Sequence, residues 1–194
     1  DFDAKIREDA WLNYAKLSYD IGNPYNSTPQ VLSEFLENYP KSPFRETIEL
    51  LLVDSYISSK NYKEALQLLE SNLRNALKPS YQKVVFYRAL ELYNSSDYEQ
   101  AQTLLEKAIA LDIDPYITAK ATYWKAEIDF SNLNFDAALQ GFLSYKNTVS
   151  ARTSPEYKNI DYHLGYTYFK LKQYPKAIAA FQSFILMDSP QNTF

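Results

Sequence analysis

The sequence has 194 residues with nearly balanced charge, 20 Lys and Arg against 24 Asp and Glu, and it contains no basic block. Nucleic acid is therefore not an expected partner. The absence of Cys and the single His exclude a disulfide framework, a thiolate metal site and an imidazole cluster.

No apolar run approaches the roughly 18 to 20 residues that span a bilayer, and no signal peptide is recognisable. Because the first residue is Asp, we expect the start to be a processed end or the boundary of a fragment. The sequence leaves open whether an export signal has been removed.

The low content of glycine and the placement of the prolines, the two residues that interrupt helices, indicate helices with short connections. The chain has three Gly and nine Pro. Pro43, Pro79, Pro115 and Pro155 follow one another at intervals of 36, 36 and 40 residues, and each precedes an apolar-periodic segment. Proline is tolerated in the first turn of a helix, so these four residues predict helix starts.

Five helical hairpins are predicted in chain order. In the first, residues 3–21 repeat apolar side chains at a period near 3.6, residues 21–24 end the helix, and Thr28 is expected to cap a second helix that stops at Tyr39. The second unit turns at residues 58–61, and its return helix is expected to reach Leu73. The approximate unit boundaries are 3–39, 43–76, 80–111, 115–147 and 155–187.

An aromatic residue follows the turn in four of the five units. These residues are spaced by 36, 37 and 39 positions, and an Ala follows each of them three residues later. The aromatic residues are Tyr62, Tyr98, Phe135 and Tyr174, and the alanines are Ala65, Ala101, Ala138 and Ala177. A small residue lets two antiparallel helices approach closely, and the ring wedges the space where they diverge.

The fifth unit resembles a tetratricopeptide repeat, whose motif has Leu-Gly, an aromatic, a turn, Ala, an aromatic and a late Pro. Here these are Leu164-Gly165, Tyr168, Tyr174, Ala177, Phe181 and Pro190. The resemblance covers almost the whole chain and is weakest in the first unit, where Val31 replaces the small residue. It implies an all-α fold: a right-handed solenoid of about five stacked antiparallel hairpins forming one repeat domain.

Catalytic chemistry has no motif behind it. Around His163 the residues four positions away are Asn159 and Thr167, and Lys170 follows at seven, so no carboxylate–histidine–nucleophile set is visible locally. Asp112 and Asp114 flank a predicted helix boundary, and capping explains Asp114 better than metal binding. No phosphate-binding glycine motif is present. We expect a non-enzymatic protein without cofactor or metal.

The 18 Tyr and 11 Phe exceed what hairpin cores need. In the resembling family the first helices line a concave face, which implies a partner-binding row made of Tyr19, Phe86, Tyr93, Tyr123, Glu127, Phe130, Tyr162, Tyr166, Phe169 and Lys170. Rings predominate where a carboxylate-clamp cochaperone would need Lys, Asn and Arg. Our hypothesis is a groove for a peptide or partner protein.

Two alternatives to a peptide groove stay open at this point. The rings fill the core of a tightly wound superhelix, or they form a site for a small molecule or glycan by stacking. Replacing Tyr123 and Tyr166 with Ala is expected to abolish partner capture without unfolding if both belong to the groove.

Location and chain ends carry two further expectations. Residues 35–43 and 61–65 resemble phrases of bacterial cell-envelope tetratricopeptide proteins, so we expect a periplasmic or outer-membrane-associated protein, with a cytoplasmic location left open. The last predicted helix is unusually apolar for a solenoid end, and residues 188–190 look like the start of another unit. A segment of a longer repeat protein, or end-to-end self-association, is expected.

Overall fold

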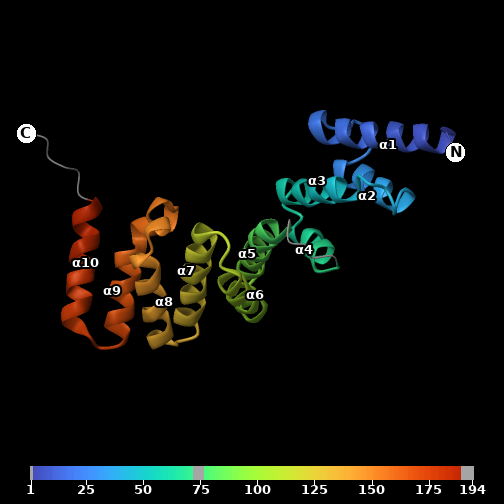
Figure 1. Ribbon diagram of the computed structural model, residues 1–194. Coiled ribbons are helices and arrows are strands. Elements are labelled where there is room, and N and C mark those ends of the chain that lie inside the picture. The colour runs from blue at the N-terminus through green and yellow to red at the C-terminus, as the bar shows by residue number, and fades with distance from the viewer. Residues whose placement is uncertain (1, 72–76, 189–194) are drawn as a thin grey trace, which may run out of the picture. The chain divides into compact units, whose positions relative to one another are not determined.

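The computed structural model describes residues 2–71 and 77–188, which form helices and turns with no strand among them (Figure 1). The predicted all-α class is confirmed. The chain divides into two compact units, residues 1–84 and 85–194, and each is considered by itself. The predicted helix end at Leu73 and the late Pro190 lie outside the described residues. No described helix is both long and apolar enough to cross a membrane.

The first unit contains α1 (Phe2–Ile21), α2 (Thr28–Asn38), α3 (Arg45–Ser58) and α4 (Tyr62–Ser71). Its core is built around α2, where Val31, Leu32 and Phe35 are fully buried against α1 and α3, and Trp11 of α1 packs against this cluster. The predicted N-cap at Thr28 is one residue late, because Ser27 holds the cap position. The Thr28 hydroxyl instead donates to the carbonyl oxygen of Ser18, at 2.9 Å.

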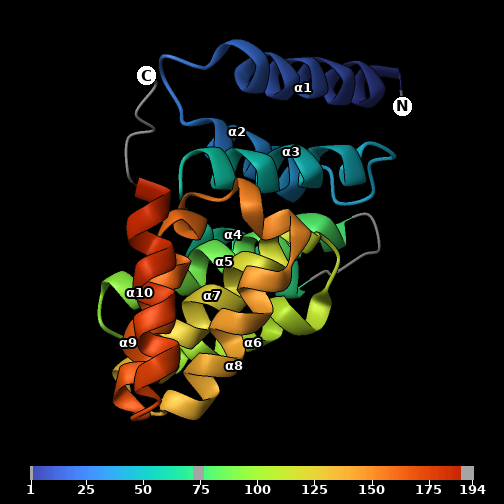
Figure 2. The same cartoon turned by 90° about the vertical axis from the view of Figure 1, so that its left-hand side faces the viewer.

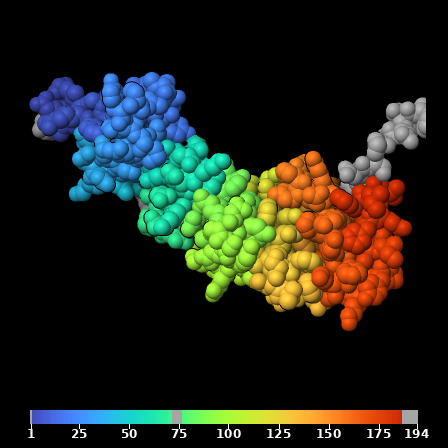
Figure 3. Space-filling model, turned by 180° about the vertical axis from the view of Figure 1, so that it is seen from behind, coloured from blue at the N-terminus to red at the C-terminus, as the bar shows by residue number. Residues whose placement is uncertain are grey.

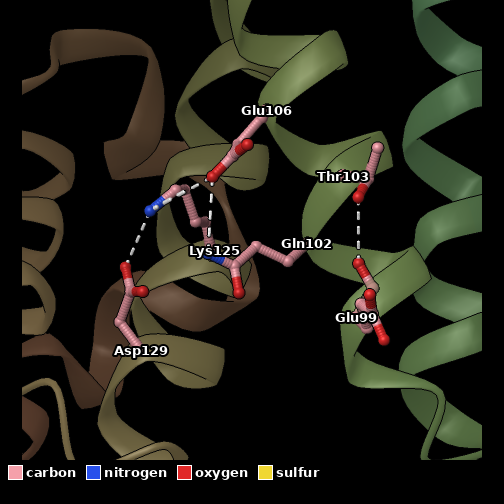
Figure 4. A network of polar contacts seen from close by, with 6 residues as sticks. All are labelled: Glu99, Gln102, Thr103, Glu106, Lys125 and Asp129. Atoms are coloured by element: carbon pink, nitrogen blue, oxygen red, sulfur yellow. Dashed lines mark hydrogen bonds and ion pairs between the residues drawn. The ribbon is translucent and has the colours of Figure 1, made fainter.

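The second unit continues from α5 (Lys78–Asn94), which begins before the unit boundary, through α6 (Tyr98–Leu111), α7 (Pro115–Ser131), α8 (Phe135–Asn147), α9 (Ile160–Lys170) and α10 (Tyr174–Asp188). Helices α7 to α10 lie side by side in chain order (Figures 1 and 2). From the opposite side, the atoms of these helices run without a break from yellow to red (Figure 3). Polar contacts join α6 to α7, with Lys125 between Glu106 and Asp129 (Figure 4).

The fifth predicted unit does not open as an α-helix at Pro155. Two short 3-10 turns, Val149–Thr153 and Pro155–Asn159, precede α9. Packing explains the difference, because Ala151 is fully buried and the hydroxyl groups of Tyr145 and Ser154 are hydrogen-bonded to each other. The connecting segment therefore packs into the core itself, and the α-helix starts only at Ile160.

Four hairpins share one turn geometry. The residues two positions before the turn aromatics are in the left-handed region, with φ of 60° at Lys60, 65° at Ser96, 64° at Leu133 and 59° at Lys172. In the last of these, the amide of Lys172 donates to Phe169 O at 3.0 Å, and the amide of Gln173 donates to Tyr168 O at 2.9 Å. The other three repeat the pattern, which is the Schellman motif of helix ends. None uses the usual glycine.

Pairs of rings close three of these turns. A ring in the last turn of the first helix packs on the turn aromatic of the same hairpin, with centroids 5.3 Å apart for Tyr93 and Tyr98, 5.3 Å for Phe130 and Phe135, and 5.9 Å for Phe169 and Tyr174. The alanines three residues after the turn aromatics are all buried. The ring that fills the space beside the turn and the small residue that lets the two helices approach closely therefore occur together, as the spacing predicts.

Candidate partner-binding surface

A pocket of about 330 Å³ opens between the first helices of the last two hairpins. Glu127 and Phe130 line it from α7, and Tyr162, His163 and Tyr166 line it from α9. The spacings of three and four residues place each pair on one face of its helix. Four residues of the predicted row, Glu127, Phe130, Tyr162 and Tyr166, are thus brought together at one site.

The tyrosine rings of this pocket are held on one side and open on the other. Tyr162 and Tyr166 pack on each other with centroids 4.8 Å apart, and Phe184 and Phe181 of α10 support them at 5.6 and 5.4 Å respectively. Tyr162 nevertheless stays 41% exposed and Tyr166 42%. Rings that are both fixed and accessible suit contact with a ligand, because little side-chain entropy is lost on binding.

The polar pocket residues Glu127 and His163 form a chain with Tyr123, which lies behind the pocket and does not line it. The hydroxyl of Tyr123 lies 3.1 Å from Nε2 of His163, and Nδ1 of His163 lies 2.7 Å from Oε1 of Glu127. Burial, and then the charge of Glu127, raise the pKa of Tyr123 far above its ordinary value. The hydroxyl therefore keeps its proton and is able to donate to Nε2, and a neutral imidazole that accepts there carries its own proton on Nδ1.

Two members of the predicted row lie in the core instead of on the surface. Phe86 is fully buried with the ammonium of Lys120 over its ring at 5.6 Å. Tyr123 is 6% exposed, and its ring lies 5.0 Å from Tyr145 and 5.8 Å from Phe142. Their burial does not suit the surface role expected for these rings. Tyr123 faces α8, the second helix of its hairpin, and helical periodicity alone does not reveal this.

The other members of the row lie apart from the pocket. Tyr93 and Phe169 pack in hairpin turns, and exposed Lys170 does not line the pocket. Tyr19 belongs to the first unit, where its hydroxyl donates to a carboxylate oxygen of Asp54, and this bond raises the pKa of Tyr19.

His163 is the pocket residue that sequence reasoning did not select. Its partners Tyr123 and Glu127 lie on another helix, so a search within one helical turn could not find them. A signal was present in the repeat itself. The turn aromatics Phe135 and Tyr174 are 39 residues apart, which makes Tyr123 and Tyr162 equivalent positions and puts His163 next to the row.

Within residues 2–71 and 77–188 no three His, Asp or Glu side chains are grouped so that they could hold a metal ion. The capping interpretation of Asp114 is confirmed, because its carboxylate accepts from the amide of Tyr116 at 2.8 Å. Asp112 ends α6 in a left-handed conformation.

Antiparallel helix pairs that recur in chain order, with one turn geometry and a pocket between neighbouring first helices, define an α-helical repeat protein. Residues 86–147 and 161–186 each match a family model described as tetratricopeptide repeat. These two segments are tetratricopeptide repeats, and the chain has the fold of an all-α solenoid. No curated protein matches it.

Solved structures of the same fold are similar over almost their whole length. The MamA RS-1 ArsTM double mutant has a TM-score of 0.60 at 15% identity, covering 96% of this chain and 97% of that one. MamA 41-end from Desulfovibrio magneticus RS-1 has a TM-score of 0.58 at 16% identity, covering 96% and 97%. A Podosopora anserina putative kinesin light chain with nearly identical TPR-like repeats scores 0.51 at 15% identity, covering 97% and 98%.

Proposed function

We propose that this chain is a non-enzymatic scaffold that binds a peptide segment of a partner protein at the pocket between α7 and α9. The observation that carries the proposal is the pair of supported but two-fifths exposed rings, Tyr162 and Tyr166, beside Glu127 and Phe130. Tyrosines of this kind dominate the binding energy of many protein interfaces. The tetratricopeptide repeat fold supports the same interpretation.

Affinity capture with matched variants tests this function. Immobilised wild-type protein and a Tyr162→Ala/Tyr166→Ala variant are exposed to a bacterial cell-envelope extract, and bound proteins are quantified by mass spectrometry. Tyr25→Ala is the control, because Tyr25 is 91% exposed on a loop of the first unit. A partner retained by wild type and Tyr25→Ala but lost from the double variant supports the proposal. Equal retention by all three proteins refutes it.

A glycan or small-molecule site is the second candidate function. The same rings favour it, since sugars stack on tyrosine faces. Glycan-array binding that is lost in the Tyr162→Ala/Tyr166→Ala variant, with no protein captured, would replace the first proposal.

The use of an envelope extract reflects a further part of the proposal, a location in the bacterial periplasm or at the outer membrane. That part rests on the sequence phrases at residues 35–43 and 61–65.

The exposed side of α10 favours end-to-end self-association as an additional property. Ile178, Ile185 and Leu186 are all more than half exposed on this helix. Spacings of seven and eight residues bring these side chains to one side of the helix, and apolar surface that is grouped in this way often marks an interaction site. We expect light scattering to give a mass above the 22.5 kDa of one chain, and an Ile178→Glu/Ile185→Glu variant to return it to that mass. A stable wild-type monomer would contradict this.

A further inference from the structure

The charge of Glu127 sets the pocket between α7 and α9 apart from the rest of the second unit. Other buried or largely buried carboxylates of this unit each have a lysine: Asp129 pairs with Lys125 at 2.9 Å, Glu156 with Lys120 at 3.1 Å, and Asp161 with Lys146. Figure 4 shows the first of these pairs on α7. The side chain of Glu127 is only 19% exposed. Within residues 2–71 and 77–188 no Lys or Arg lies at ion-pair distance from it.

A neutral His163 brings no charge to replace the missing lysine. Oε1 of Glu127 is buried and makes no well-formed hydrogen bond among the described residues, although Nδ1 of His163 is 2.7 Å away. The contact is one of proximity and not of good hydrogen-bond direction. When the imidazole is neutral and accepts from Tyr123, it leaves the charge of Glu127 uncompensated. A buried carboxylate without a full counter-charge is costly unless a cation completes the site.

The walls of the pocket have the chemistry that favours a cation as well. Phe130, Tyr162 and Tyr166 surround the opening, and an aromatic face attracts an ammonium or guanidinium group within about 6 Å. The volume of about 330 Å³ is at the lower end of pockets that enclose small ligands, which suits one side chain better than a folded partner.

We propose that this pocket receives a lysine or arginine side chain of the bound peptide, with Glu127 as counter-charge and the rings of Phe130, Tyr162 and Tyr166 as walls. The proposal rests on the peptide-binding function proposed above and names what the peptide carries. Glu127 thereby gains the partner that the neighbouring carboxylates already have within the chain.

Peptide selection followed by a double-mutant cycle tests the proposal. A display library of random 12-residue peptides is selected against wild-type protein. Each Lys or Arg of the selected peptides is then replaced by norleucine, which keeps the aliphatic stem and removes the charge. Dissociation constants are measured against wild type, Glu127→Gln and, as a matched control, Glu99→Gln. Glu99 is an exposed carboxylate of α6 outside the pocket (Figure 4).

The expected result is a coupled loss. Norleucine at one cationic position weakens binding to wild type about tenfold, and Glu127→Gln weakens the cationic peptide by a similar factor while leaving the norleucine peptide within about twofold. Glu99→Gln changes neither. Tyr166→Leu is a second variant that keeps apolar bulk without an aromatic face, and it is expected to weaken only the cationic peptide. Circular dichroism melting of each variant confirms that it is folded.

Three outcomes are separable. Coupled losses support the cationic pocket. Peptides whose binding needs Tyr162 and Tyr166 but tolerates norleucine at every position overturn the cationic pocket and leave the peptide-binding function standing. A library that yields no binding peptide overturns both.

Discussion

Truncation of Tyr123 and Tyr166 to alanine separates core rings from surface rings. A fully enclosed tyrosine buries about 200 Å². At 6% exposure Tyr123 buries about 190 Å² of this, and at 42% Tyr166 buries about 115 Å². At about 25 cal/mol per Å², these buried areas stabilise the fold by about 4.7 kcal/mol for Tyr123 and about 2.9 kcal/mol for Tyr166. The area that alanine still buries is similar at both positions, so the two variants should differ in stability by about 2 kcal/mol. A cavity at position 123 enlarges that difference, because the site is enclosed by Phe142 and Tyr145.

Thermal unfolding followed by circular dichroism measures the difference. For a domain near 100 residues, about 2 kcal/mol corresponds to roughly 8 °C or more in Tm. We therefore expect Tyr123→Ala to melt at least about 8 °C below Tyr166→Ala, and only Tyr166→Ala to remain folded well enough for a clean binding defect. Equal melting temperatures for the two variants would refute the division of the row into core and pocket.

Three further predictions concern packing, turns and pH. Gly165→Ala should lower the free energy of unfolding in urea by about 1–2 kcal/mol, although such a change usually stabilises a helix, because the new Cβ would lie 2.6 Å from Phe181. A gain in stability would contradict this packing. Leu133→Gly should raise the free energy of unfolding by about 0.5 kcal/mol, because exposed Leu133 has a φ of 64°, in the left-handed region that glycine adopts without strain. A clear loss of stability in the same assay would show that the leucine side chain contributes to the fold. Burial raises the pKa of Tyr145 in the folded chain to about 12. As pH rises, the unfolded chain therefore loses this proton at a lower pH than the folded chain does. The free energy of unfolding should then fall between pH 10 and 12, by up to about 1.4 kcal/mol per pH unit, and Tyr145→Phe should flatten that slope.

The hairpin plan was predictable from sequence because it depends on local signals. Turn aromatics, their following alanines and Pro115 mark helix ends with residues whose effect is felt within a few positions. Pro155 failed as a helix start because the preceding residues are needed elsewhere: Ala151 fills core space and Ser154 bonds Tyr145. Sequence alone does not show that kind of competition.

The candidate site was predictable in part for the same reason. Periodicity along one helix brings Tyr162 and Tyr166 to one face, and the repeat length brings Glu127 near them. It does not tell which neighbours of that face turn toward the second helix, so Tyr123 was placed on the surface. The link from His163 to Tyr123 spans 40 residues and depends on how two hairpins pack, which no local pattern contains.

The two tryptophans give each compact unit its own intrinsic fluorophore. Trp11 packs against the core of the first unit, and Trp124 lies beside Tyr123, with ring centroids 5.5 Å apart, in the second. A Trp11→Phe variant therefore has tryptophan emission only from α7, one residue from the tyrosine that contacts His163. Its tryptophan emission follows melting of the second unit, while that of Trp124→Phe follows the first unit, so the two units can be followed separately without an attached dye.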